Sequence, residues 1–240
     1  MGGIVETYQK TRKRPDLFWN TYVCRPPAAV IVHLLAPTRV TPNQITLSAF
    51  VVASGAAAMI ALLPGYWGLL AGVLVFQFSY VLDCADGMLA RLRGIQSPVG
   101  HLLDFLMDEI KAFILLGAVA LRLFAEHQDV RFLMLGIGGL VCLASGIALT
   151  TFQRRPEIVT WLSSRSPAAP AATGAPSKPS PLRRLIGLAE SAAKFLIHYP
   201  SYILYAALAG RIEFYFYPYI VVNALYALRT LLWVALRFGR

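Results

Sequence analysis

The chain of 240 residues is strongly apolar: 57% of its residues are hydrophobic and only 14% are charged, with a mean hydropathy of +0.59. This composition excludes an ordinary soluble domain and indicates an integral membrane protein. The formal net charge of +10 is typical of basic loops that face anionic lipid, so we expect membrane lipids and no nucleic acid as partners. The three cysteines lack CxxC spacing and predict neither a disulfide framework nor a zinc site.

The first 43 residues are predicted to form a cytoplasmic N-terminal region. They are polar, basic and rich in proline, unlike a cleavable signal peptide. Within them, residues 16–35 combine apolar and aromatic side chains such as Phe18 and Trp19 with charged ones such as Arg25. This mixture favours an interfacial helix lying on the cytoplasmic surface over a further membrane span.

Residues 44–240 are predicted to form a six-helix transmembrane domain, so the fold class is an all-α polytopic membrane protein. A helix needs about 20 apolar residues to cross the hydrocarbon layer. The segment 163–181 is rich in Pro, Ser and Ala and is predicted to be a flexible cytoplasmic linker. Six runs have the required length: 44–63, 67–90, 100–123, 131–152, 186–209 and 214–238.

The distribution of basic residues predicts the orientation of these spans. Of the 22 Lys and Arg residues, 18 fall on one side: six before residue 44, two (Arg91 and Arg93) between spans two and three, seven from Arg154 to Lys194, and three at Arg229, Arg237 and Arg240. Three (Arg122, Arg131 and Arg211) fall on the opposite side. The positive-inside rule therefore places both termini in the cytoplasm. We expect an integral protein of a bacterial inner membrane whose site faces the cytoplasm.

The acidic residues are concentrated near the predicted cytoplasmic ends of spans two and three. A carboxylate inside a membrane costs about 2.5–3.5 kcal/mol, so four of them cost roughly 10 kcal/mol unless cations compensate them. Few basic residues lie nearby, which disfavours a purely structural charge network, and oxygen ligands without Cys or His favour Mg²⁺ or Mn²⁺ over zinc. Five of the 12 acidic residues lie in this region: Asp83, Asp86, Asp104, Asp108 and Glu109.

Helical spacing predicts that these carboxylates converge. Asp83 and Asp86 lie about one turn apart on one face of span two, and Asp104 and Asp108 lie one turn apart on one face of span three. Because the two spans are antiparallel neighbours, both pairs can reach one site at a similar depth.

Small residues accompany the aspartates. They leave room for a ligand, although close helix packing also explains them. The combined pattern reads Asp83-x2-Asp86-Gly87-x2-Ala90-Arg91-x8-Gly100-x3-Asp104-x3-Asp108. This pattern resembles the complete signature of the CDP-alcohol phosphotransferase family, and the segment Thr41–Thr46 is similar to the PNxxT segment of that family.

The resemblance implies an enzyme of phospholipid biosynthesis that transfers a substituted phosphate from a CDP-alcohol, typically CDP-diacylglycerol, to an acceptor hydroxyl and releases CMP. It implies that two divalent ions, Mg²⁺ or Mn²⁺, bind to the four aspartates, that Asp108 is the general base, and that the protein is a homodimer. The same resemblance implies a nucleotide site formed by Asn43, Asp86, Gly87, Ala90, Arg91 and Gly100, in which Arg91 contacts the diphosphate.

Basic residues predict the acceptor. Lys111, Arg154 and Arg155 would bind a phosphate on an acceptor such as glycerol 3-phosphate or inositol phosphate. Positive-inside placement also explains the arginine pair, and an ion pair with Glu109 or Asp108 also explains Lys111. Uncharged or zwitterionic acceptors (serine, choline, inositol or a lipid alcohol) and a soluble CDP-alcohol donor stay open as alternatives.

A divalent-cation transporter is the alternative from another functional class, because carboxylates inside a membrane also mark ion pathways. Transport predicts polar residues that continue to the opposite face. The stretches 69–76 and 113–121 contain no charge, so the sequence favours the enzyme. A protein that has lost activity would be expected to lack one of the aspartates, and all four are present.

Overall fold

The structure, a computed structural model, describes residues 3–13, 16–165, 187 and 199–238. Within this part the chain is helical and contains no strand, which confirms the predicted all-α class. The chain divides into two compact units, Met1–Met134 with Pro200–Phe216 and Leu135–Tyr199 with Tyr217–Arg240. Each unit is described by itself.

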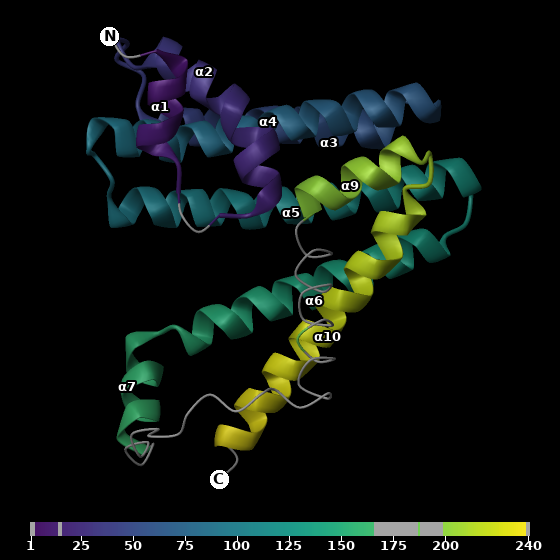
Figure 1. Cartoon of the computed structure of the whole chain (residues 1–240). Coiled ribbons are helices and arrows are strands. Elements are labelled where there is room, and N and C mark those ends of the chain that lie inside the picture. Colours follow the sequence, from purple (N-terminus) through teal and green to yellow (C-terminus); the bar gives the residue numbers. More distant parts are fainter. Residues whose placement is uncertain (1–2, 14–15, 166–186, 188–198, 239–240) are drawn as a thin grey trace. The chain divides into compact units, whose positions relative to one another are not determined.

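The helices follow the predicted apolar runs closely. In the first unit, α3, α4 and α5 run side by side and α2 packs on α4 (Figure 1). Helices α6 and α10 begin in the first unit and continue into the second. The bounds are α1 (Ile4–Thr11), η1 (Asn20–Cys24), α2 (Arg25–Leu35), α3 (Pro42–Leu62), α4 (Gly65–Arg93), α5 (Pro98–His127), α6 (Arg131–Gln153), α7 (Pro156–Arg165), α9 (Tyr199–Leu208) and α10 (Glu213–Phe238).

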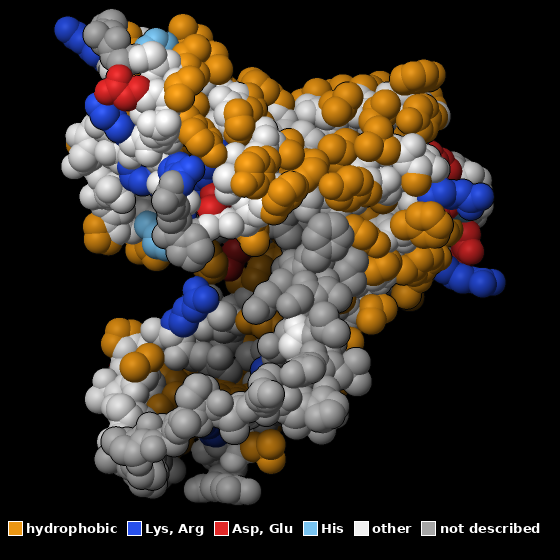
Figure 2. Space-filling view, viewed as in Figure 1, with side chains coloured by type: hydrophobic (Ala, Val, Ile, Leu, Met, Phe, Trp, Pro, Cys, Tyr) orange, Lys and Arg blue, Asp and Glu red, His pale blue; other side chains and the backbone are white. Residues whose placement is uncertain are grey.

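Four helices of the described chain, α3, α4, α6 and α10, are long and apolar enough to cross a membrane. Many of their large apolar side chains are exposed, among them Val51 and Phe78, and Figure 2 shows hydrophobic side chains spread over the visible face of the first unit. Helix α5 has 30 residues but is not one of these four; Asp104, Asp108, Glu109 and Lys111 lie in it. Most of the predicted span 186–209 lies outside the described residues, and α9 covers its end.

Local sequence signals set the ends of the helices that carry the aspartates. Helix α4 ends at Gly94, whose φ of 66° is the left-handed conformation that glycine adopts readily. Helix α5 begins at Pro98, and the Ser97 hydroxyl accepts a hydrogen bond from the Gly100 amide at 3.0 Å. The short connection makes α4 and α5 a helical hairpin, which brings the two halves of the motif to one end.

Close packing holds α3 against α4. A Cβ atom on Gly72 would lie 2.7 Å from Cγ1 of Ile60 and 3.2 Å from the carbonyl oxygen of Ala56. Only a glycine permits this approach of the two backbones. At the start of α3, Thr41 and Gln44 form a reciprocal capping box.

Two short helices, α1 and α7, were not anticipated from the apolar runs. Helix α1 packs on α2 and α4, and η1 and α2 fill most of the predicted interfacial helix 16–35; their placement at the membrane surface stays a prediction. Helix α7 includes residues 163–165 of the predicted linker, and residues 166–181 lie outside the described part.

Candidate active site

Three of the four predicted metal ligands lie together where α4 faces α5. Asp83, Asp104 and Asp108 each offer a carboxylate oxygen, and these oxygens lie within 4.8 Å of one another. The side chain of Asp83 is 11% exposed and that of Asp108 is 40% exposed. The two helices therefore converge as the helical spacing predicted, with one buried and one accessible carboxylate.

Lys111 lies inside this acidic group. Its ammonium forms ion pairs with Asp83 and with Asp108, the latter at 3.0 Å, and its side chain is only 2% exposed. The sequence predicts that Lys111 binds the acceptor phosphate, with an ion pair to Glu109 or Asp108 as the alternative. The structure shows the ion pair with Asp108 and a second one with Asp83. The acceptor role of Lys111 stays a prediction.

The carboxylates of this group fit a bound cation. Lys111 supplies one positive charge to a group of three carboxylates. Oδ1 of Asp104 is buried and accepts no hydrogen bond from any described residue. A buried acceptor without a donor is costly, and a divalent ion satisfies it. Asp83, Asp104 and Asp108 thus form a donor set suited to Mg²⁺ or Mn²⁺.

Asp86 stands apart from the group of three. It is 5% exposed, and the hydroxyl of Thr46 on α3 donates a hydrogen bond to its Oδ2. No role was predicted for Thr46 itself; its place in the Thr41–Thr46 segment, which is similar to the family's PNxxT segment, is the feature of the sequence that pointed to one. The assignment of Asp86 as a metal and nucleotide ligand stays a prediction.

Two of the small residues, Gly87 and Gly100, lie beside polar side chains. A Cβ on Gly87 would lie 3.4 Å from NH1 of Arg91, and a Cβ on Gly100 would lie 3.4 Å from Oδ1 of Asn43. Ala90 is half-buried near the end of α4. The predicted nucleotide residues lie at the N-terminal ends of α3 and α5 and near the C-terminal end of α4.

Arg154 and Arg155 follow the end of α6. They belong to the second unit, whereas the aspartates belong to the first. Their backbone amides donate to the carbonyls of Thr150, Thr151 and Phe152. Their predicted role in acceptor binding stays a prediction.

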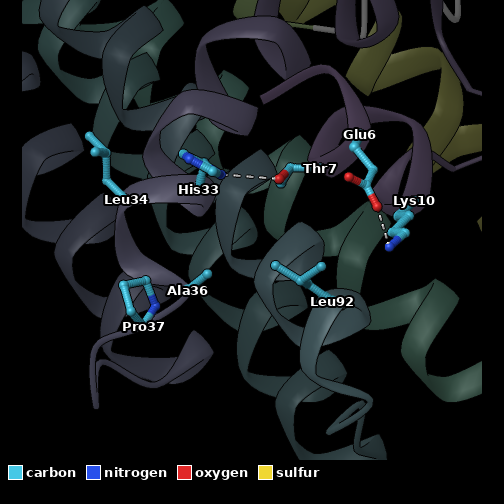
Figure 3. A pocket seen from close by; sticks show the side chains of 8 residues that line it. All are labelled: Glu6, Thr7, Lys10, His33, Leu34, Ala36, Pro37 and Leu92. Atoms are coloured by element: carbon cyan, nitrogen blue, oxygen red, sulfur yellow. Dashed lines mark hydrogen bonds and ion pairs between the residues drawn. The ribbon is translucent and has the colours of Figure 1, made fainter. Parts of the chain in front are cut away.

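A cavity of about 450 Å³ lies in the first unit among α1, α2 and the end of α4 (Figure 3). On α1, Glu6 pairs with Lys10 at 2.6 Å, and Thr7 Oγ1 of α1 lies 3.4 Å from His33 Nδ1 of α2. None of the predicted site residues lines this cavity. Its lining consists of Glu6, Thr7, Lys10, His33, Leu34, Ala36, Pro37 and Leu92.

Comparison with known proteins identifies relatives of this chain. It is 32% identical over 137 residues to phosphatidylinositol phosphate synthase from Corynebacterium glutamicum, which is 55% of this chain and 60% of that protein. It is 34% identical over 83 residues to the bifunctional IPC transferase and DIPP synthase from Archaeoglobus fulgidus, which is 35% of this chain and 16% of that protein. The chain therefore spans less than two thirds of each of these relatives.

The family model for CDP-alcohol phosphatidyltransferase matches residues 39–176. This range is more than half of the chain and contains every predicted site residue, from Asn43 to Arg155. The match agrees with the resemblance that the aspartate and glycine spacing indicated. The chain belongs to the CDP-alcohol phosphatidyltransferase family.

Proposed function

We propose that the protein transfers a substituted phosphate from CDP-diacylglycerol to an acceptor hydroxyl and releases CMP. The observation that carries this proposal is the group of Asp83, Asp104 and Asp108, whose carboxylate oxygens lie within 4.8 Å of one another in a chain of this family. Such a group suits a reaction in which charge on a diphosphate must be neutralised.

The four aspartates of the motif would hold two divalent ions, Mg²⁺ or Mn²⁺. When bound, these ions supply neutralisation of the diphosphate and of the departing CMP. Lys111 fixes Asp83 and Asp108 relative to each other through its two ion pairs. Thr46 fixes Asp86 by a hydrogen bond. Positioned carboxylates of this kind reduce the reorganisation that the reaction requires.

Asp108 would be the general base. The acceptor oxygen forms a bond to the phosphorus that carries the alcohol, the bond from this phosphorus to the CMP oxygen breaks, and the hydroxyl proton passes to a carboxylate oxygen of Asp108. The 40% exposure of its side chain lets an acceptor approach, whereas Asp83 is mostly buried. A base must lie within hydrogen-bond reach of the proton that it removes.

The proposed topology has six spans with both termini in the cytoplasm of a bacterial cell. Four helices with the length and apolarity of spans support it, and α5 and the segment ending in α9 would supply the other two. The aspartates would then open toward the cytoplasm, where CMP is released. A homodimer completes the proposal.

The acceptor is proposed to carry a phosphate, as inositol phosphate or glycerol 3-phosphate does. One relative is a phosphatidylinositol phosphate synthase by name, and Arg154 and Arg155 follow α6 with guanidinium groups suited to bidentate phosphate binding. The buried ion pairs of Lys111 favour these arginines over Lys111 as the phosphate ligands.

The test is release of CMP by detergent-purified protein with CDP-diacylglycerol and Mn²⁺. The acceptors are glycerol 3-phosphate, inositol phosphate, inositol, serine and choline, and the control variant is Asp108→Asn. We expect release with a phosphorylated acceptor and none with the variant. Release with inositol, serine or choline alone overturns the acceptor proposal. If no acceptor supports CMP release, and liposomes that contain the protein take up Mn²⁺, the proposed enzyme activity is overturned in favour of a transporter.

A further inference from the structure

Two residues that precede α2, Thr11 at the end of α1 and Asn20 at the start of η1, contact α4. Nε of Arg91 donates a hydrogen bond of 2.7 Å to the carbonyl oxygen of Thr11. Earlier in α4, the Tyr80 hydroxyl donates a hydrogen bond of 2.9 Å to Oδ1 of Asn20. The chain before α2 is thus fixed beside Arg91, a residue that the family resemblance assigns to the diphosphate.

A buried ion pair holds Arg25, the first residue of α2. Nε of Arg25 donates to Oδ2 of Asp16, and the two side chains are 7% and 8% exposed. Oδ1 of Asp16 accepts from the Leu17 amide at 2.9 Å and from the Asn20 side chain at 3.2 Å. Both oxygens of Asp16 are therefore engaged, and the orientation of the Arg25 guanidinium is fixed through Nε.

A second nitrogen of the Arg25 guanidinium, NH1, is buried and lacks a hydrogen-bond acceptor among the described residues. A buried charged donor without an acceptor is costly, so such groups in proteins usually meet a hydrogen-bond acceptor. The charges of Arg25 and Asp16 both act on the guanidinium of Arg91. The two guanidinium groups repel each other, the one carboxylate of Asp16 offsets part of this repulsion, and an anion bound near both would offset more of it.

A neighbouring arginine shows what a purely structural role looks like. Arg93, two residues beyond Arg91, directs NH1 and NH2 to backbone carbonyls at and just after the end of α2. These hydrogen bonds satisfy its guanidinium and tie α2 to α4. The acceptors are the carbonyl oxygens of Leu35, Ala36, Thr38 and Val40, at 2.5–3.3 Å.

We propose that Arg25 is a second arginine of the donor site, which donates through NH1 to a phosphate oxygen of the cytidine diphosphate group beside Arg91. This inference rests on the proposed function and adds a residue from outside the aspartate motif. Asp16 positions the guanidinium without taking up NH1. A guanidinium can donate to a carboxylate and to a phosphate at the same time in a fixed planar geometry, which the ammonium of lysine cannot reproduce.

The experiment is calorimetric titration of detergent-purified protein with CDP and, separately, with cytidine, both in the presence of Mn²⁺. The variants are Arg25→Gln and Arg25→Lys, with Arg93→Gln as the matched control, and each is also checked by thermal unfolding. We expect Arg25→Gln to weaken CDP binding about tenfold or more while cytidine binding is unchanged. The CDP affinity of Arg25→Lys should lie between those of the unaltered protein and of Arg25→Gln. Arg93→Gln should lower the Tm without changing the CDP affinity.

Unchanged CDP affinity in Arg25→Gln overturns the proposal and leaves Arg25 a structural residue. Equal losses for CDP and cytidine also overturn it, because they report general damage to the site. If Arg25→Gln does not fold, Arg25→Lys decides: CDP affinity equal to that of the unaltered protein overturns the proposal, and a loss confined to CDP supports it. Absence of CDP binding by the unaltered protein would instead overturn the proposed function.

Discussion

The hydroxyl of Thr46 on α3 donates a hydrogen bond to the carboxylate of Asp86 on α4, and both side chains are buried. This bond joins the Thr41–Thr46 segment to the aspartate motif, although the two residues lie 40 positions apart. The capped N-terminus of α3 is thereby part of the support for the candidate site.

Replacement of Thr46 tests this support. Thr46→Val keeps the shape of the side chain but leaves a buried carboxylate oxygen of Asp86 without its donor, so we expect a loss of about 1–3 kcal/mol in the free energy of unfolding. Thermal unfolding in detergent measures it. Thr46→Ser retains the hydroxyl and should behave nearly as the unaltered protein; an equal loss in both variants would contradict the assignment of the effect to the hydroxyl.

Removal of metal tests the carboxylate group as a whole. Excess chelator should abolish CMP release, and added Mg²⁺ or Mn²⁺ should restore it, because the aspartates would otherwise repel the diphosphate of the donor. The readout is CMP released per unit time before and after metal is added back. Undiminished turnover in excess chelator would contradict the metal assignment.

Asp108→Asn tests the general base. A positioned base contributes about 10²–10⁴-fold to the rate, so kcat should fall by that factor while the affinity for CDP changes little. Rate measurements and calorimetry on the same preparation separate the two effects. Near-normal transfer would assign the base to another residue.

Lys111→Met tests the ion pairs inside the acidic group. It leaves Asp83 and Asp108 without their lysine, and breaking a buried pair in this way costs about 3–5 kcal/mol. We expect a lower Tm that rises more with added Mn²⁺ than the Tm of the unaltered protein does, because metal then supplies the missing positive charge. A Tm deficit that is independent of Mn²⁺ would show that Lys111 and metal do not act on the same carboxylates.

Asp16→Asn tests the ion pair with Arg25 through its pH dependence. Burial raises the pKa of Asp16, but the hydrogen bond and the charge of Arg25 outweigh it and hold the pKa below its ordinary value. A carboxyl whose pKa is lowered in the folded state stabilises the fold above the pKa of the unfolded chain, about 3.9. The Tm difference between the unaltered protein and the variant should be constant from pH 5 to 7 and should shrink as the pH falls below about 4. A difference that stays constant down to pH 3 would contradict this assignment.

The positions of the long helices could be predicted because length and apolarity alone decide them. The predicted run 44–63 became α3 (Pro42–Leu62), and 131–152 became α6 (Arg131–Gln153). The approach of Asp83 to Asp104 and Asp108 was predictable for a similar reason: one-turn spacing on two helices of a short hairpin leaves few other arrangements. Asp86, which the same spacing placed with them, is not part of this group.

Other features depend on tertiary contacts that no local pattern reveals. The long side chain of Lys111 could reach several carboxylates, and the rotation of α4 against α5 selects Asp83 across the hairpin. The short helices α1 and α7 are too short to be stable alone, so packing decides whether they form. The bond between Thr46 and Asp86 joins two helices whose register the sequence does not specify.

The ion pair between Lys111 and Asp108 also bears on the proposal that α5 is a membrane span. The two residues lie three positions apart on the same helix, so the pair can form as soon as that turn of α5 is helical. In the proposed topology α5 would therefore carry a counter-ion for one of its acidic side chains within its own sequence. Such a pair would lower the cost of placing this helix in the bilayer without a contribution from α4.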